Sequence, residues 1–265
     1  MVLRIRREVY RLVYEFSPVG IIRSCFKEKF GIPRQPGLVP QAWATLELQA
    51  PFDSDDWSRG LEEFSHLWLI YLFHATTPKR QKSTVRPPRL GGNRRLGVFA
   101  TRAPFRPNPI GLSVVRLVAI ERGVPGTLLH LEGVDILDGT PVVDIKPYVP
   151  YADAPPNVHG GYAETPPIVL SVRFDMAADA AARDAGPEGA EDLRPLIVGL
   201  LRLDPRPAYH ARRAGGDVYG MKICDVDVKW QVENGGASVR VLCVEKVAPT
   251  TSPRRVVKDF RATDE

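Results

Sequence analysis

Residues 112–134, LSVVRLVAIERGVPGTLLHLEGV, decide the fold class of this chain. Leu112–Glu121 and Thr127–Val134 are rich in leucine and β-branched residues, and a spacer with glycine and proline separates them. Two short apolar runs around a turn-forming spacer predict two β-strands.

Further runs of the same kind lie on both sides of this stretch. They are Tyr10–Cys25, Ala42–Leu48, Leu67–His74, Leu96–Thr101 and Ile168–Phe174. Because many short strands occur without long helical patterns between them, the sequence predicts a mainly β protein, a barrel or a sandwich, and not a parallel α/β sheet. The proline-rich segment 104–109 cannot continue a helix or a sheet, so we predict a fixed loop there.

The composition changes after Phe174, where alanine, aspartate and glycine dominate up to about residue 192. We therefore predict a first domain at residues 12–175, a linker at 176–192 whose first half suits a short helix, a small α+β domain at 193–250 and a disordered tail at 251–265. Within the second domain, Leu193–Leu203 has helical spacing. Val218–Trp230 and Ser238–Val247 are predicted to pair as two strands joined through residues 233–236.

Overall charge and cysteine content narrow the class of protein. The 265 residues carry a formal net charge of +5, which suits a polyanionic partner without requiring one. The longest apolar run, Leu67–Phe73, is too short to cross a bilayer, and the N-terminus lacks the pattern of a secretory signal, so we expect no membrane span and a cytoplasmic location. Cys25, Cys224 and Cys243 are far apart in the sequence and are predicted to be small core residues, not zinc ligands.

The segment from Phe64 to Ile120 contains no aspartate or glutamate, although the whole chain has 31 acidic residues. It contains many basic residues, among them Arg86, Arg89, Arg102 and Arg106. Several of these arginines adjoin prolines, which lower the entropic cost of aiming a guanidinium group. Arginine suits bidentate recognition of phosphate or carboxylate, so the segment predicts a nucleic-acid contact; a solvated face is the alternative for any single arginine.

The predominant charge changes from positive to negative in Asp135-Ile136-Leu137-Asp138-Gly139-Thr140-Pro141. Lys146 and Tyr148 follow this stretch. Carboxylates at such a turn can bind ribose hydroxyls, accept a proton or simply cap the turn, and spacing alone does not decide between these roles. Neither His66 nor His74 has the spacing of a metal ligand, and no metal site is predicted. The glycine motifs of dinucleotide and P-loop folds and the nucleophile elbow are absent, so the residues alone indicate a basic β-barrel that binds RNA.

Several long motifs resemble the TsaA/TrmO family when they are taken in order. The resemblance covers about residues 16–170, and Asp204-Pro205-Arg206-Pro207-Ala208-Tyr209 resembles the smaller C-terminal domain of bacterial members. The motifs are residues 18–24 (PVGIIRS), 27–38 (KEKFGIPRQPGL), 64–68 (FSHLW), 84–93 (TVRPPRLGGN), 99–113 (FATRAPFRPNPIGLS) and 138–148 (DGTPVVDIKPY).

This resemblance implies a single-sheet β-barrel that binds S-adenosylmethionine, works as a homodimer and methylates threonylcarbamoyl-modified adenosine beside the anticodon of transfer RNA. The family's cofactor-contacting positions correspond here to Pro33, Arg34, Gln35, His74, Ala75, Arg102, Leu112, Asp135, Ile136, Leu137 and Asp138. The two charge features of the sequence are thereby expected to meet at one site. A non-catalytic RNA-binding barrel and a small-molecule methyltransferase remain the alternatives.

Methyl transfer to this nitrogen predicts a proton acceptor and a reader of the threonyl carboxylate. Asp138 and His74 are the catalytic candidates, and Arg106 or Arg34 suits the carboxylate. Phe105 is a candidate for base stacking, although a core position suits it too, and Arg206 and the Arg212-Arg213 pair are candidates for holding the anticodon arm. The predicted substrate-binding residues are Arg106, Arg86, Arg89, Lys146, Tyr148 and Tyr209.

Overall fold

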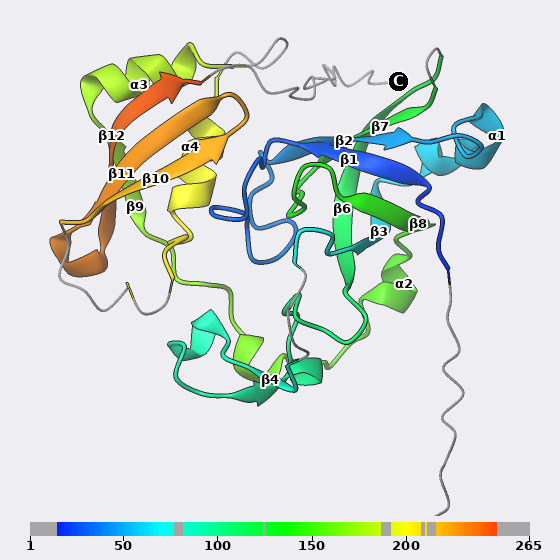
Figure 1. Ribbon diagram of the computed structural model, residues 1–265, viewed down its shortest axis with the longest axis horizontal. Coiled ribbons are helices and arrows are strands. Elements are labelled where there is room, and N and C mark those ends of the chain that lie inside the picture. The colour runs from blue at the N-terminus through cyan, green and yellow to red at the C-terminus, as the bar shows by residue number, and fades with distance from the viewer. Residues whose placement is uncertain are drawn as a thin grey trace, which may run out of the picture.

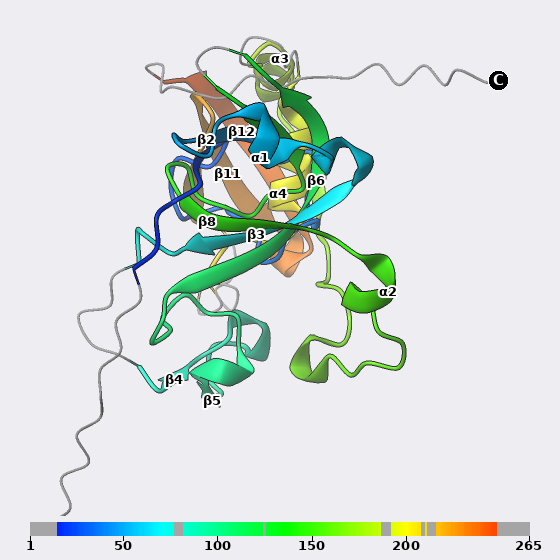
Figure 2. The ribbon, with the colours of Figure 1, turned by 90° about the vertical axis from the view of Figure 1, so that its right-hand side faces the viewer.

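The computed structural model describes residues 15–76, 82–123, 126–186, 192–207, 210 and 216–247. Six antiparallel strands form one closed barrel in the order β1-β2-β7-β6-β3-β8. Figure 1 shows this barrel beside a second sheet, and Figure 2 shows the strands from the side. The barrel strands are β1 (Gly20–Ser24), β2 (Trp43–Leu48), β3 (His66–Leu72), β6 (Ile110–Glu121), β7 (Leu128–Glu132) and β8 (Pro141–Pro147).

Alternation along the strands explains the barrel core. In β3, Leu67, Leu69 and Tyr71 face inward and are buried, while the residues between them are more exposed. Successive side chains of a strand point to opposite faces, so one apolar set fills the barrel. Small additional elements lie outside the barrel sheet: α1 (Asp55–Ser58), α2 (Pro150–Asp153), a two-stranded sheet of β4 (Thr84–Val85) and β5 (Leu96–Gly97), and 3-10 turns at Leu61–Glu63, Pro88–Leu90, Val98–Ala100, Gly161–Ala163 and Asn234–Gly236.

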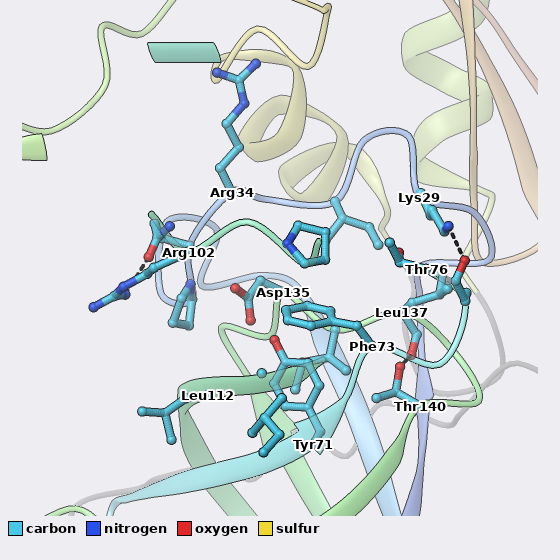
Figure 3. Close-up of a pocket in the computed structure, with 18 of the residues that line it drawn as sticks. Lys29, Arg34, Tyr71, Phe73, Thr76, Arg102, Leu112, Asp135, Leu137 and Thr140 are labelled. Carbon is cyan, nitrogen blue, oxygen red and sulfur yellow. Dashed lines mark hydrogen bonds between the residues drawn. The ribbon is translucent and has the colours of Figure 1, made fainter. Parts of the chain in front are cut away.

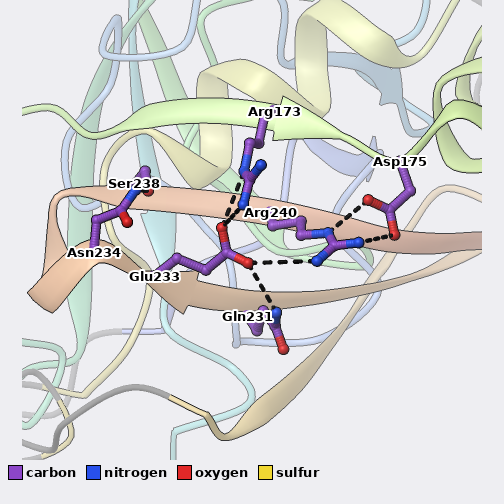
Figure 4. Close-up of polar contacts among 7 residues, drawn as sticks. All are labelled: Arg173, Asp175, Gln231, Glu233, Asn234, Ser238 and Arg240. Carbon is purple, nitrogen blue, oxygen red and sulfur yellow. Dashed lines mark hydrogen bonds and ion pairs between the residues drawn. The ribbon is translucent and has the colours of Figure 1, made fainter.

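The second sheet has four strands in the order β10-β11-β12-β9. Three of them are antiparallel, and β9 is parallel to β12. Figure 4 shows a polar ladder across β9, β11 and β12, in which Glu233 accepts hydrogen bonds from Arg173 and pairs with Arg240, and Arg240 also binds Asp175. The elements are β9 (Ser171–Phe174), α3 (Met176–Arg183), α4 (Arg194–Leu201), β10 (Val218–Ile223), β11 (Val226–Glu233) and β12 (Ser238–Lys246).

The two sheets share one hydrophobic core and touch through backbone contacts. The amide of Cys224 donates to the carbonyl of Cys25 at 2.7 Å, and Phe26 forms an isolated β-bridge with Ile223. The amide of Lys222 donates to the Glu28 carboxylate at 3.0 Å. The segment that follows β1 is therefore fixed against β10.

The prediction of a single-sheet barrel with a smaller α+β C-terminal domain is confirmed, but several element predictions need correction. The strand expected at Ile168–Phe174 forms as β9 but belongs to the second sheet, so the change of sheet comes before Ser171. The short helix expected in the first half of the linker at residues 176–192 is present as α3. The stretch Leu96–Thr101 is a strand for two residues only and then turns.

Two further differences concern strands. Val218–Trp230 is not one strand but the hairpin β10–β11, which reverses at Cys224 with a φ of 53°. Strand β8 closes the barrel although no strand was expected there. Cys25 and Cys224 are buried as expected, whereas Cys243 is partly exposed. The predicted disordered tail at 251–265 lies outside the described residues.

Candidate functional site

A cavity of about 470 Å³ opens at the end of the barrel where β1 and β3 end and where β6 and β8 begin. This volume falls within the usual range of small-molecule pockets. Its lining comes from stretches that are far apart in the sequence: residues 29–36, 68–76, 101–106, 110–112 and 135–140. The closure of the barrel brings these stretches together.

One side of the cavity, here called the strand wall, consists of Tyr71, Gly111 and Asp135, with Ser113 behind them. The hydroxyls of Tyr71 and Ser113 lie 3.2 Å apart, and Ser113 Oγ donates to Asp135 Oδ1 at 2.6 Å. Figure 3 shows the Asp135 carboxylate and the Tyr71 hydroxyl facing one another. The register of β3 and β6 places Gly111 opposite Tyr71, and the missing side chain leaves space for the tyrosine ring.

The strand wall perturbs the acidity of two of its members. Burial raises the pKa of Asp135 to about 6, although the hydrogen bond from Ser113 and the charge of Arg102 oppose the shift. Burial, and then the charge of Asp135, raise the pKa of Tyr71, so its hydroxyl remains protonated. The cavity therefore holds a carboxylate whose ionised form is poorly solvated.

The opposite side, here called the loop wall, consists of residues 29–36. Arg34 extends away from the other cavity residues toward the C-terminal domain (Figure 3), where its Nη2 donates to the carbonyl of Arg206 at 3.2 Å. Gln35 accepts a hydrogen bond from Arg102 at 2.5 Å, and the Lys29 ammonium donates to the carbonyl of Ala75. Burial lowers the pKa of Arg34, and the charge of Asp204 partly offsets this effect.

The charges around the cavity are unequal. Among the described residues that line it, Lys29, Arg34, Arg102 and Arg106 carry positive charge, and Asp135 is the single carboxylate. The remaining surface is largely apolar and includes Ile32, Phe73, Leu112, Ile136 and Leu137. This lining suits a ligand that combines an apolar ring with one anionic and one cationic group.

His74 also lines the cavity. Burial and the nearby charge of Lys29 lower the pKa of His74, and the charge of Asp138 acts in the opposite direction. The imidazole is therefore neutral near pH 7, with one ring nitrogen able to accept a proton.

The structure gathers ten of the eleven predicted cofactor positions around this cavity: Pro33, Arg34, Gln35, His74, Ala75, Arg102, Leu112, Asp135, Ile136 and Leu137. The exception is Asp138, which is not among the lining residues. Its carboxylate accepts the amide of Ser24 at 2.9 Å and pairs with Lys27 at 3.0 Å. Asp138 thus fixes the segment after β1 to the turn before β8.

The predicted substrate-binding residues are scattered by comparison. Only Arg106 lines the cavity, and its Nη1 donates to the carbonyls of Val98 and Thr101 at 3.2 and 2.6 Å. Arg86 is exposed outside the cavity, Arg89 binds Thr165, Lys146 pairs with Asp144, and the Tyr148 ring lies 6.1 Å from that of Trp68. Tyr209, Arg212 and Arg213 lie outside the described residues.

The structure also shows where other residues singled out in the sequence lie. Arg206 is 4% exposed and binds Asp204 through two nitrogens, so it is an internal contact and not a surface for RNA. Phe105 is half-buried beneath the Lys82 ammonium, whereas Phe99, which was not singled out, is 77% exposed. The sequence reasoning also missed Tyr71 and Ser113, and only the inward-facing alternation of β3 and β6 could have indicated them.

Within the described ranges, no three histidine, cysteine, aspartate or glutamate side chains group closely enough to hold a metal ion. None of the helices in these ranges has both the length and the apolar character that crossing a bilayer requires.

Comparison with known proteins gives consistent matches along the chain. The model of the tRNA-methyltransferase O N-terminal domain matches residues 21–154, and the model of the TrmO C-terminal domain matches residues 167–246. The chain is 44% identical over 230 residues to an Escherichia coli K12 protein named tRNA (adenine(37)-N6)-methyltransferase, which covers 86% of this chain and 97% of that protein.

Two proteins of Pseudomonas aeruginosa are similar as well. One, described as a candidate S-adenosylmethionine-dependent methyltransferase, is 51% identical over 219 residues, which cover 83% of this chain and 93% of the other. The crystal structure of TrmO from the same species superposes with a TM-score of 0.74 at 44% identity, over 88% of this chain and 99% of that one.

Proposed function

The chain belongs to the tRNA-methyltransferase O family, and we propose that it transfers a methyl group from S-adenosylmethionine to the exocyclic nitrogen of adenosine 37 in transfer RNA. The observation that carries this proposal is the cavity, which gathers ten predicted cofactor positions from five separate stretches of chain. Its volume and its mixture of apolar and charged lining fit the proposed cofactor.

S-adenosylmethionine, when bound, supplies a methyl group on a positively charged sulfur. Arg102 lines the cavity, and its guanidinium suits the carboxylate of the amino-acid part. Leu112, Ile136 and Leu137 provide apolar contacts suited to the adenine ring.

The acceptor nitrogen is a weak nucleophile because its lone pair is delocalised into the adenine ring and, in the threonylcarbamoyl form, into a carbonyl group. We assign the acceptance of its proton to a ring nitrogen of His74, since the lowered pKa keeps this imidazole neutral. Asp138 suits this role less, because its carboxylate is already bound to Lys27 and to the Ser24 amide.

The threonylcarbamoyl substituent carries a carboxylate, and Arg106 is our candidate to bind it. Among the described residues, Arg106 donates only through Nη1, and two carbonyls fix the orientation of its guanidinium. Arg34 suits this role less, because it binds carbonyls of the C-terminal domain.

Transfer RNA requires a larger surface than the cavity. Arg86, Arg94 and Arg95 are exposed around β4 and β5 and suit phosphate contacts. Phe99 is exposed, with the Arg106 guanidinium 5.8 Å from its ring centre, and it suits stacking of an unpaired base. The family resemblance supports a homodimer, and a transfer RNA substrate supports a cytoplasmic location.

Methylation of defined transfer RNAs tests the proposal. The purified protein with S-adenosylmethionine should methylate transfer RNA that carries threonylcarbamoyladenosine, and mass spectrometry of nucleosides should detect one added methyl group. Replacement of Arg102 by alanine should lower the rate at limiting cofactor by about 10- to 100-fold, because a hydrogen bond to a charged group is lost.

Arg183→Ala is the matched control, because Arg183 pairs with Asp179 within α3 and lies outside the cavity. Its rate should equal that of the wild type. Binding of transfer RNA without methylation would indicate a non-catalytic RNA-binding protein. Methylation of small molecules alone would indicate a different methyltransferase.

A further inference from the structure

Asp135 differs from the other acidic residues near the barrel end because, among the described residues, no basic side chain forms an ion pair with it, although the charge of Arg102 acts on it from a distance. Asp138 pairs with Lys27, and Asp144 pairs with Lys146. Among the described residues, no lysine or arginine forms an ion pair with Asp135, whose side-chain partner is the neutral hydroxyl of Ser113. The cavity thus contains an ionisable carboxylate with no cation of the protein bound to it.

This arrangement needs a physical reason, because an unpaired carboxylate in a poorly solvated place is costly. A neutral amide could accept the same hydrogen bond from Ser113 without that cost. The carboxylate becomes favourable once a cation binds next to it, since opposite charges attract strongly where water is excluded. The strand wall is therefore suited to a positively charged part of a ligand.

The surroundings of Asp135 indicate which kind of cation fits. An ammonium group carries three N–H donors and requires several acceptors. The Tyr71 hydroxyl faces Asp135 and already hydrogen-bonds with Ser113, and the ring of Phe73 lies 5.4 Å from the Tyr71 ring (Figure 3). Aromatic rings and one carboxylate suit a cation without N–H donors, which is held by charge and by aromatic faces.

We propose that Asp135, oriented by Ser113 and Tyr71, binds the positively charged sulfur of S-adenosylmethionine and thereby makes the protein prefer this cofactor over its demethylated product. This inference rests on the proposed function. S-adenosylhomocysteine retains the ammonium and the carboxylate but has a neutral sulfur. The two ligands therefore isolate the interaction with the sulfonium.

Calorimetric titration of the full chain with S-adenosylmethionine, S-adenosylhomocysteine and 5′-methylthioadenosine tests the assignment. In Asp135→Asn, affinity for S-adenosylmethionine should fall about tenfold or more, because a charge-assisted contact in a water-poor site is lost. Affinity for S-adenosylhomocysteine should change less than about twofold, because no full charge faces Asp135 in that complex. The ratio of the affinity for S-adenosylmethionine to that for S-adenosylhomocysteine should therefore fall toward one.

Asp227→Asn is the matched control, because Asp227 pairs with Lys229 in the C-terminal sheet and the substitution has the same chemistry. It should leave both affinities unchanged. Equal weakening of S-adenosylmethionine and S-adenosylhomocysteine in Asp135→Asn, with 5′-methylthioadenosine unaffected, would assign Asp135 to the ammonium and overturn the proposal. Equal weakening of all three ligands would make its role merely structural.

A second measurement needs no variant. As the pH falls through about 6, protonation of Asp135 should lower wild-type affinity for S-adenosylmethionine relative to S-adenosylhomocysteine. The other charged or titratable groups that face Asp135 among the described residues are Arg102, from the loop before β6, and Tyr71, from β3, whose raised pKa keeps its hydroxyl protonated in this range. His74, elsewhere in the cavity lining, also titrates and meets both ligands, which is why the ratio of affinities is compared.

A ratio that does not vary with pH would overturn the proposal. Failure of the wild type to bind either ligand would overturn the proposed function together with this assignment. Binding of both ligands with no change of ratio in Asp135→Asn would overturn this assignment alone.

Discussion

The strand wall and the loop wall enclose the same cavity but are held in place by different forces. In the strand wall, Tyr71 and Ser113 are inward-facing residues of paired strands, so the register of β3 and β6 fixes them. The loop wall has no regular hydrogen-bonding ladder of its own. Contacts with the C-terminal domain hold it, through Arg34 on the carbonyls of Asp204 and Arg206.

This difference shows that the C-terminal domain supports one wall of the cavity. Glu28, just before the loop wall, accepts a hydrogen bond from the Lys222 amide, and Gly31 within the loop wall lies against Met221 of β10. Loss of the C-terminal sheet would therefore release one wall of the cavity and leave the other in the barrel. We expect its deletion to weaken cofactor binding as well as RNA binding.

The largest effect is expected from Gly111→Ala in the strand wall. An added Cβ would lie 2.2 Å from Cε2 and 2.4 Å from Cζ of Tyr71, and this ring is only 5% exposed. The ring or the strand must move, and we expect a loss of about 3 kcal/mol in the free energy of unfolding. Urea unfolding measures this loss, and calorimetry should show weaker cofactor binding.

Gly97→Ala provides the matched control, because a Cβ at Gly97 meets nothing within 4 Å. Its free energy of unfolding should stay within about 0.5 kcal/mol of the wild-type value. Similar stability of the two alanine variants would show that Tyr71 and its strand can move at little cost. The strand wall would then not be held more rigidly than the loop wall.

The elements that could be predicted from the sequence are those that neighbouring residues in the chain determine. The short runs rich in leucine and β-branched residues identified β3 and β6, and the family motifs indicated ten positions of the cavity lining. Strand β8 was missed because PVVDIKP contains prolines and charged residues that disfavour a strand. Its pairing with β1 and β3 overrides those local preferences.

The remaining errors concern a pairing between distant strands, a turn without the usual turn residues, and a contact that depends on strand register. Strand β9 pairs with β12, more than sixty residues later, and no local pattern specifies such a pairing. The reversal at Cys224 contains neither glycine nor proline, so the hairpin β10–β11 resembled one long strand. The Tyr71, Ser113 and Asp135 contact depends on register, and it was therefore not predictable from spacing.

A smaller effect is expected from Gly31→Ala in the loop wall. Gly31 has a φ of +91°, and an added Cβ would lie 2.2 Å from Sδ of Met221. Methionine is flexible and can give way in part, so the clash should cost about 1–2 kcal/mol beyond the backbone strain. We expect weaker cofactor binding, because the loop wall is displaced from β10.

Gly37→Ala separates the clash from the strain. Gly37 has a similar φ of +76°, but nothing lies within 4 Å of a Cβ there. It should therefore show the backbone penalty alone, measured by thermal and urea unfolding. If Gly31→Ala and Gly37→Ala lose the same stability and bind cofactor equally well, the contact with Met221 does not support the loop wall.

The smallest effect concerns the charge held in the strand wall. The folded protein raises the pKa of Asp135 from 3.8 to about 6, so it binds this proton more tightly than the unfolded chain does. The ionised carboxylate therefore reduces stability above about pH 6, and this penalty disappears as the pH falls below 3.8. The full difference in pKa corresponds to about 3 kcal/mol, and partial exposure reduces it, so we expect about 1 kcal/mol.

Without cofactor, Asp135→Asn should accordingly be more stable than the wild type at about pH 7, and the gain should vanish toward about pH 4. Urea unfolding across this range measures the gain, and Asp227→Asn, which removes the ion pair with Lys229, should not show it. A gain of this kind together with weaker binding would mean that the site keeps a destabilising charge for its ligand. A pH-independent difference would instead mean that the strand wall holds no unfavourable charge, and the two walls would then differ only in how they are anchored.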